Sequence, residues 1–141
     1  YRSTAGADLI FSTGGASNST MVLTETGNVG VNTFNPRTKL DVNGTFSVSE
    51  QSIGVNSSGN IILGSVNVGQ IVLTGSRLLS FNCSLTAVGV SGQRLVIVNT
   101  TGVSVGVICG GSTYSIGNND AKEFVYSSAT SRWHSFNSTL L

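Results

Sequence analysis

The chain has 141 residues, of which 39% are hydrophobic and only 9% are charged, and its formal net charge is +1. A typical globular domain has about 25% charged residues, and disordered chains combine high charge with few apolar residues, so the composition excludes disorder. The Lys and Arg residues are scattered singly, which argues against nucleic-acid binding because no basic stripe exists to neutralise phosphates. No apolar run approaches the eighteen or so residues that span a bilayer, so membrane insertion is not expected.

The first twenty residues contain one short apolar run, 9–11, and then a small, polar segment, 12–20, that reads as a loop. Residues 21–24 are predicted to form the next strand. Apolar residues then alternate with small or polar ones in three short segments, 29–31, 40–42 and 46–48, which predicts β-strands.

Turn signals separate these predicted strands. Gly27-Asn28 and Asn43-Gly44 are turn dipeptides, and Asn-Gly favours a tight hairpin turn. Pro36, the only proline, holds Asn35 out of the helical region. The stretch from residue 26 to residue 48 is therefore predicted to be a series of short strands with tight connections.

Residues 27–44 resemble a repeat found in the shafts of viral fibres, especially phage tail fibres. The resemblance rests on an ordered set of residues at the family spacing: Gly27, Asn28, Gly30, Thr33, Pro36, Lys39, Leu40, Asp41, Val42 and Gly44. Asn32 stands where the family usually has glycine, and asparagine is the next residue most tolerant of a left-handed backbone. Looser echoes of the motif follow at 58–64 and 68–75.

The resemblance implies an all-β chain with a trimeric β-helical or interwound shaft, in which three chains share one axis. Each repeat is too thin to bury its own apolar face, so stability has to come from neighbouring repeats or chains. The candidates to meet at the axis are Val29, Val31, Leu40, Val42, Ile53 and Val55. The alternative is a monomeric sandwich that uses these residues as its own core.

The sequence changes character from about Gly75, where the predicted strands become longer and more apolar. They are 77–85, 94–99, 103–109, 113–116, 121–127 and 132–136, with residues 122–136 as a closing hairpin. Short strands at this spacing favour an antiparallel β-sandwich, and no segment carries a helical apolar period with a cap. We therefore expect a shaft over 1–70 and a sandwich head over 71–141.

The two cysteines, Cys83 and Cys109, each lie in an alternating apolar row and are predicted to point into the core. Two buried free thiols and a disulfide between them both fit this pattern, because the sequence does not give the distance between their Cα atoms.

The sequence offers no clear catalytic or metal-binding set, so no enzyme activity, cofactor or metal is expected. A glycan-cleaving fibre would need two carboxylates about 5–10 Å apart, and only Glu25 and Asp41 suggest themselves. Asp41 belongs to the structural motif, however. His134 is the only histidine and is expected to be a partly exposed strand residue.

The resemblance implies an extracellular position at the fibre tip on the virion surface and attachment of a homotrimer to a glycan or protein receptor. The segments 114–120 and 127–134 combine aromatic faces with polar tips and are the candidate contact loops. Within and beside them, the candidate receptor-binding residues are Tyr114, Asn118, Asn119, Arg132 and His134. Two alternatives remain: a tailspike-like enzyme that degrades polysaccharide, and a purely structural module for trimerisation or the shaft tip.

Overall fold

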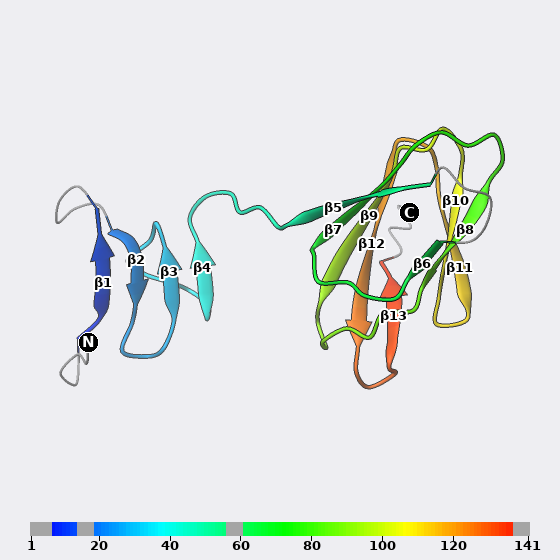
Figure 1. The fold of residues 1–141 in the computed structure, drawn as a ribbon. Helices are drawn as coiled ribbons and strands as arrows, with labels where there is room; N and C mark the ends of the chain where they lie inside the picture. Colours follow the sequence, from blue (N-terminus) through cyan, green and yellow to red (C-terminus); the bar gives the residue numbers. More distant parts are fainter. Residues whose placement is uncertain (1–6, 14–18, 56–60, 137–141) are drawn as a thin grey trace, which may run out of the picture. The chain divides into compact units, whose positions relative to one another are not determined.

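The computed structural model describes residues 7–13, 19–55 and 61–136, and these residues form thirteen β-strands and no helix. The expected all-β class is therefore confirmed. The chain divides into two units, Tyr1–Ser47 and Val48–Leu141, called here the N-terminal unit and the C-terminal unit (Figure 1).

The N-terminal unit is a single four-stranded sheet with the order β1-β2-β3-β4. Its strands are β1 (Leu9–Ser12), β2 (Ser19–Leu23), β3 (Val29–Val31) and β4 (Leu40–Val42). Strands β1, β2 and β3 pair antiparallel, whereas β4 lies parallel to β3, because residues 32–39 carry the chain back along the sheet. The loop expected over 12–20 falls largely on residues 14–18, which lie outside the described residues.

The turn residues of this unit behave partly as expected. Gly27, in the β2–β3 connection, has a φ of +77°, and Asn32 has a φ of +55°, the left-handed conformation that asparagine tolerates. The expected hairpin at Asn43-Gly44 is wrong, since β4 is the last strand of its sheet and has no antiparallel partner after the turn. Gly44 instead has a φ of +152° in an extended connection.

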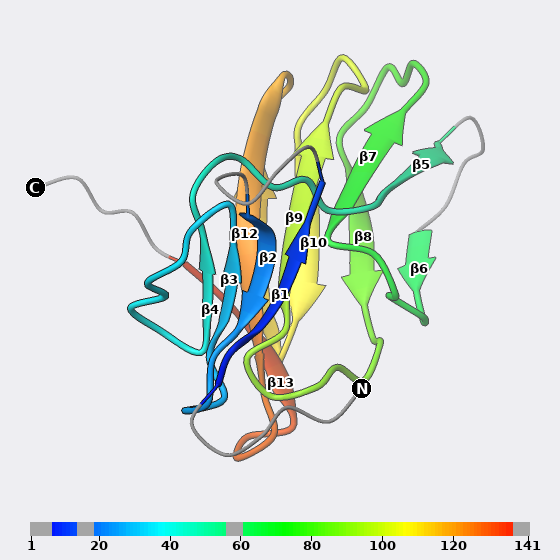
Figure 2. The same cartoon turned by 90° about the vertical axis from the view of Figure 1, so that its left-hand side faces the viewer.

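The C-terminal unit consists of two β-sheets (Figures 1 and 2). The four-stranded sheet has the order β11-β10-β8-β6, and its strands are Ser112–Ile116, Val105–Cys109, Phe81–Leu85 and Ile61–Leu63. The five-stranded sheet has the order β13-β12-β9-β7-β5, and its strands are Arg132–Ser135, Asp120–Ser127, Arg94–Asn99, Gln70–Thr74 and Glu50–Gly54.

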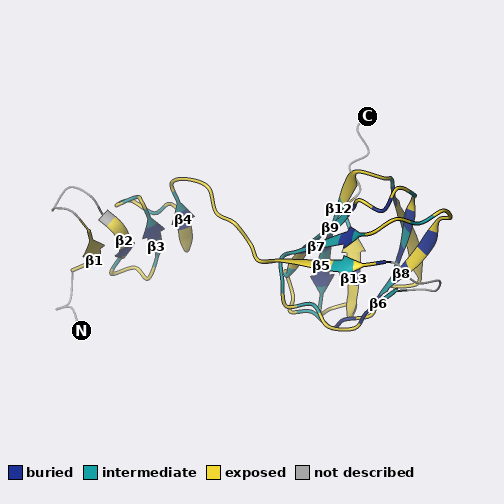
Figure 3. Cartoon of the chain, turned by 45° about the horizontal axis from the view of Figure 1, so that its top comes forward, coloured by how far each residue is buried: buried dark blue, intermediate teal, exposed yellow. Residues whose placement is uncertain are grey.

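Burial alternates along the strands and gives each sheet of the C-terminal unit one buried face. In β9, for example, Leu95, Ile97 and Asn99 are buried while the residues between them are more exposed. The resulting core comprises Val55, Leu63, Ile71, Leu73, Phe81, Cys83, Leu85, Ala87, Leu95, Ile97, Val105, Val107, Cys109, Ile116, Phe124, Tyr126 and Trp133. Figure 3 shows that buried residues gather mainly in this unit.

Three features of the C-terminal unit differ from the sequence-based expectation. The head is not an antiparallel sandwich: β5, β7 and β9 pair in parallel, and so do β6, β8 and β10. The structural division falls after Ser47, so residues 48–70 belong to this unit although the sequence assigned them to the shaft. Val55 lies in its core and Ile53 packs against that core, so neither is available to line a shaft axis.

The two cysteines are free and buried in the core of the four-stranded sheet. Cys83 on β8 lies opposite Val107 on β10, which places Cys109 two residues further along β10. Strand spacing then separates their Cα atoms by roughly 8 Å, beyond the reach of a disulfide. Burial raises the pKa of Cys83 to about 12 and that of Cys109 to about 11.

We expect neither thiol to react readily with a water-soluble disulfide reagent in the native protein. The raised pKa values lower the thiolate fraction about a thousandfold at Cys83 and about a hundredfold at Cys109, and burial blocks access as well. Colorimetric titration should find two reactive thiols only after denaturation. Rapid labelling of either cysteine in the native protein would contradict the buried positions of β8 and β10.

Candidate functional site

The strand register of the N-terminal unit gathers its apolar side chains on one face of the sheet. Directly paired residues of neighbouring strands point to the same side. Two rows therefore cross all four strands: Leu9, Leu23, Val29 and Leu40 form one, and Phe11, Met21, Val31 and Val42 form the other. These eight residues are called the apolar face.

The described residues of the N-terminal unit leave the apolar face uncovered. None of its eight residues is buried, and Leu40 and Phe11 remain 61% and 53% exposed. The row that points to the opposite side contains a glycine and an acidic residue as well as apolar residues: Ile10, Val22, Gly30 and Asp41. Among the described residues of this unit, Val22 is the only apolar residue whose side chain is fully buried. The unit is thus a one-layer sheet with an unpartnered hydrophobic side.

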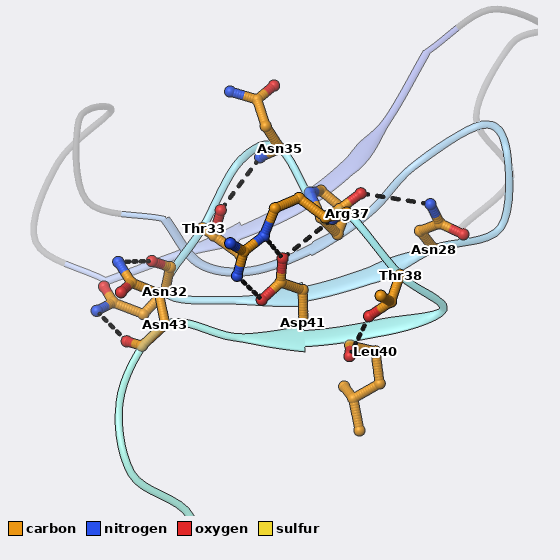
Figure 4. A network of polar contacts seen from close by, with 10 residues as sticks. Asn28, Asn32, Thr33, Asn35, Arg37, Thr38, Leu40, Asp41 and Asn43 are labelled. Atoms are coloured by element: carbon orange, nitrogen blue, oxygen red, sulfur yellow. Dashed lines mark hydrogen bonds and ion pairs between the residues drawn. The ribbon is translucent and has the colours of Figure 1, made fainter.

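Around Gly30 and Asp41, the opposite side is covered by the unit's own loop, which an ion pair holds to β4 (Figure 4), whereas Ile10 on β1 is 47% exposed. Asp41 Oδ2 accepts hydrogen bonds from Arg37 Nε at 2.8 Å and from the Arg37 backbone N–H at 3.0 Å, while Oδ1 accepts one from the guanidinium at 3.2 Å. These bonds hold the pKa of Asp41 down at about 2. Asp41 of the motif and Arg37, which lies at a variable position of the motif, therefore hold the 32–39 connection over the sheet.

Other motif residues complete this connection. Asn28 Nδ2 donates to the Pro36 carbonyl, and Lys39 Nζ donates to the Thr26 carbonyl. The amides of Asn32 and Asn43 each donate to the other residue's carbonyl oxygen, which ties the start of the loop to the end of β4 (Figure 4). The polar residues of the motif thus have local structural contacts.

The ion pair predicts an acid-sensitive N-terminal unit. Because the pKa of Asp41 falls from 3.8 to about 2 on folding, the stabilisation is fully present above pH 4 and is lost as the pH falls through about 2. Asp41→Asn should remove this component of the pH dependence. Thermal unfolding of the unit at a series of pH values would measure it, and an unchanged pH profile in Asp41→Asn would contradict the assignment.

The five candidate receptor-binding residues of the C-terminal unit do not gather in one place. Asn118 and Asn119 precede β12, whereas Arg132 begins β13 and pairs with Ser127 at the other end of β12. At about 3.4 Å per residue, the eight residues of β12 separate these two groups by roughly 24 Å. Tyr114 lies in β11, half-buried, with its ring edge-on to Phe124.

The other four candidates form hydrogen bonds within the chain. Asn118 Oδ1 accepts a hydrogen bond from the Gly102 N–H, and the Asn119 N–H donates to the Asn99 carbonyl. Arg132 donates to the Gly110 carbonyl at 3.3 Å, and His134 Nε2 lies 2.7 Å from Thr130 Oγ1. His134 is exposed on β13, as the sequence predicted.

A buried asparagine braces the loops at the Asn118 end of the sandwich. Asn99 is fully buried, and its Nδ2 donates to the carbonyls of Val103, Ile116 and Gly117. Its Oδ1 accepts from both the N–H and the hydroxyl of Thr101. One side chain therefore joins the 100–104 connection to the β11–β12 turn.

Sequence reasoning missed two exposed apolar pairs. Leu78 and Leu79, on the connection before β8, are 95% and 79% exposed, and Val88 and Val90 project from the connection after β8. The exposure of Leu78 and Leu79 was not predicted because the sequence assigned residues 77–85 to one strand, whereas β8 begins only at Phe81. On the apolar face, Leu9, Phe11, Met21 and Leu23 were also missed, since only the register joins them to β3 and β4.

Most carboxylates of the described residues have polar partners within the chain. Asp41 is bound by Arg37, Glu123 is bound by Arg94, and Asp8 accepts a hydrogen bond from the Glu25 N–H. Within the described ranges, no three His, Cys, Asp or Glu side chains are grouped as metal ligands. In the same part of the chain, no helix is long and apolar enough to cross a membrane.

Comparison with known proteins identifies no family for this chain. No protein-family model and no curated protein matches it. Among solved structures, one described as a chaperone–substrate complex is 15% identical with a TM-score of 0.42, and the alignment covers 62% of this chain but only 17% of that one. Enterohemorrhagic E. coli StcE(132-251) is 15% identical with a TM-score of 0.38, covering 61% of this chain and 94% of that one.

Proposed function

We propose that this chain is the distal part of a viral fibre on the virion surface. It forms a homotrimer, and this homotrimer attaches to a host-cell receptor. The N-terminal unit forms the end of the shaft and the C-terminal unit forms the head. The motif at 27–44 motivates the proposal, and attachment is passive binding to a glycan or protein. Three copies give avidity, so weak contacts by each head suffice.

The observation that carries the proposal is the uncovered apolar face of the N-terminal unit. Monomeric proteins rarely expose contiguous apolar patches of more than a few hundred Å². Here, a one-layer sheet exposes two complete apolar rows and is joined to a sandwich with its own core. A thin segment that needs partners, followed by a self-contained domain, is the organisation that a fibre end requires.

In this proposal, the loops at the ends of the sandwich make the receptor contacts. Two loop groups are available: one contains Asn118 and Asn119, and the other contains Arg132, with His134 close by on β13. Tyr114 contributes only its exposed edge, since its ring packs on Phe124. The proposal uses one of the two groups at a time, because the length of β12 separates them.

A purely structural role is the second candidate function. It is favoured by the intramolecular hydrogen bonds of Asn118, Asn119 and Arg132, which serve the fold of the sandwich itself. In that case the chain assembles the fibre end, and the receptor site lies elsewhere in the virion.

Saturable cell attachment separates these two functions. Fluorescently labelled chain is mixed with cells of candidate host strains, and unlabelled chain is added as competitor. The attachment role predicts saturable binding. One of two double variants should weaken this binding and the other should not: Asn118→Ala/Asn119→Ala or Arg132→Ala/His134→Ala. An intact trimer that shows no saturable binding would favour the structural role.

A further inference from the structure

Asn43 and Gly44 lie directly after the end of β4, at the start of an exposed connection. Asn43 is the only asparagine of the chain that precedes a glycine. Both residues are exposed, and the Gly44 N–H donates to no acceptor among the described residues. Gly44 has no Cβ to hinder approach to its nitrogen, and even an added Cβ would meet nothing within 4 Å. The Gly44 nitrogen is therefore open to reaction with the neighbouring side chain.

An asparagine beside such a nitrogen can modify itself without an enzyme, and asparagine is accordingly a thermolabile residue. The Gly44 nitrogen gives its proton to solvent base and attacks Asn43 Cγ. The new N–Cγ bond closes a cyclic succinimide, the Cγ–Nδ2 bond breaks, and the side-chain nitrogen leaves as ammonia. Water then opens the ring at either carbonyl, which gives aspartate or isoaspartate. Water is the co-reactant, and no atom is oxidised or reduced.

The amide that this reaction removes joins two parts of the N-terminal unit (Figure 4). Asn43 Nδ2 donates to the Asn32 carbonyl at 3.1 Å, and Asn32 Nδ2 donates to the Asn43 carbonyl at 3.0 Å. Asn32 begins the 32–39 connection with a φ of +55°, a left-handed conformation. The two hydrogen bonds therefore hold the start of this connection to the end of β4.

Both products of the reaction disrupt this pairing. An aspartate carboxylate has no hydrogen to donate, and it places a negative oxygen beside the Asn32 carbonyl. In isoaspartate the main chain runs through Cγ, which lengthens the main chain by a methylene group and displaces the carbonyl that accepts from Asn32. Either change removes the contact that ties the start of the 32–39 connection to β4.

We infer that Asn43 converts itself into aspartate and isoaspartate, and that this slow, irreversible reaction releases the start of the 32–39 connection from β4. The reaction needs neither a receptor nor a second chain, so it goes beyond the proposed attachment role and is independent of it. Newly made and aged protein then differ in the N-terminal unit. The C-terminal unit stays the same, because its core is separate.

Peptide mapping by mass spectrometry, on the full chain incubated at physiological temperature, tests the reaction. Asn35 is the matched internal control, because it is exposed on the same connection and its neighbour Pro36 has no N–H. At mildly alkaline pH, Asn43 should lose its amide at least about tenfold faster than Asn35, with isoaspartate among the products. At mildly acidic pH the loss should slow, because the Gly44 nitrogen then keeps its proton. Equal loss at the two asparagines would overturn the inference.

Hydrogen exchange on two variants tests the release. Asn43→Asp introduces the aspartate product from the start, and Asn35→Asp places the same charge on the same connection. Figure 4 shows the Asn35 side chain pointing away from its labelled neighbours, and this side chain forms no hydrogen bond with the described residues. Peptides within 29–43 should exchange at least about tenfold faster in Asn43→Asp and at the wild-type rate in Asn35→Asp. Unchanged exchange in Asn43→Asp would overturn the release.

Discussion

Replacing Gly30 with alanine should unfold the N-terminal unit and leave the C-terminal unit intact. Gly30 lies on β3 beneath the 32–39 connection, where an added Cβ would lie only 2.4 Å from the Thr33 carbonyl oxygen and 2.8 Å from Val22 Cγ1. Real Cβ atoms do not approach so closely, and a backbone oxygen moves only if the loop moves. We expect a loss of about 3 kcal/mol, at the upper end of what overpacking costs, in a unit whose described residues bury a single apolar side chain.

The glycine prediction has a built-in control and a specific readout. Gly64 has no unusual φ, and its added Cβ would find nothing closer than Thr86 Oγ1 at 3.8 Å, so Gly64→Ala should have little effect. Circular dichroism should show a partial loss of sheet signal in Gly30→Ala, while Trp133 fluorescence, which reports the buried core of the C-terminal unit, is unchanged. Full sheet content in Gly30→Ala would mean that the loop does not lie where the structure places it.

Replacing Asn99 with alanine should destabilise the C-terminal unit by about 3–5 kcal/mol. The side chain makes three donor contacts to carbonyls and accepts two hydrogen bonds from Thr101, all at a fully buried position. Alanine would remove the Asn99 acceptor of the buried Thr101 N–H, leave the Thr101 hydroxyl only its longer contact with the Val103 carbonyl, and take a donor from the Ile116 carbonyl. Leaving buried polar groups unpaired costs more than the net gain from forming each bond.

Urea unfolding followed by Trp133 fluorescence would measure this loss. Asn82→Ala is the matched control, because Asn82 is an exposed asparagine on β8 and its removal should change the free energy of unfolding by less than about 0.5 kcal/mol. A similarly small change in Asn99→Ala would show that the 99–103 and 116–117 connections hold together without the amide.

The sequence located most strands of the C-terminal unit because their signal is local. Residues 94–99 were predicted as a strand and form β9, and the hairpin predicted over 122–136 is formed by β12 and β13. The Gly110-Gly111 pair is a turn signal of the same kind, and both residues have positive φ in the two-residue connection between β10 and β11. Period-two alternation and turn residues are enough for such elements.

Strand pairing could not be predicted in the same way. Parallel and antiparallel strands share the same side-chain period, so alternation in β7 and β9 does not reveal that they run in parallel. The echo at 68–75 resembles the motif at 27–44, yet β7 joins the sandwich and β3 joins a one-layer sheet. Because the two segments share similar turn residues, the sequence-based prediction divided the chain after residue 70. The contacts between strands divide it after Ser47.

The candidate site was predictable only in part. Val29, Val31, Leu40 and Val42 were expected to meet partners, and they do lie on the uncovered face. Leu9, Phe11, Met21 and Leu23 join them through the register of β1 and β2, which no local pattern fixes. The separation of Asn118 from Arg132 likewise depends on the length and direction of β12, since 114–134 is one continuous stretch of sequence.

Molar mass by light scattering on the purified chain tests the central claim most directly, before and after mild heating in detergent. Assembly through the apolar face predicts about 43.5 kDa, three times the 14.5 kDa of one chain, and persistence of this mass in detergent would indicate high kinetic stability. In Leu40→Asp the mass should fall to that of one chain. A wild-type mass of 14.5 kDa would contradict the account, because the two apolar rows of the N-terminal unit would then remain exposed to water.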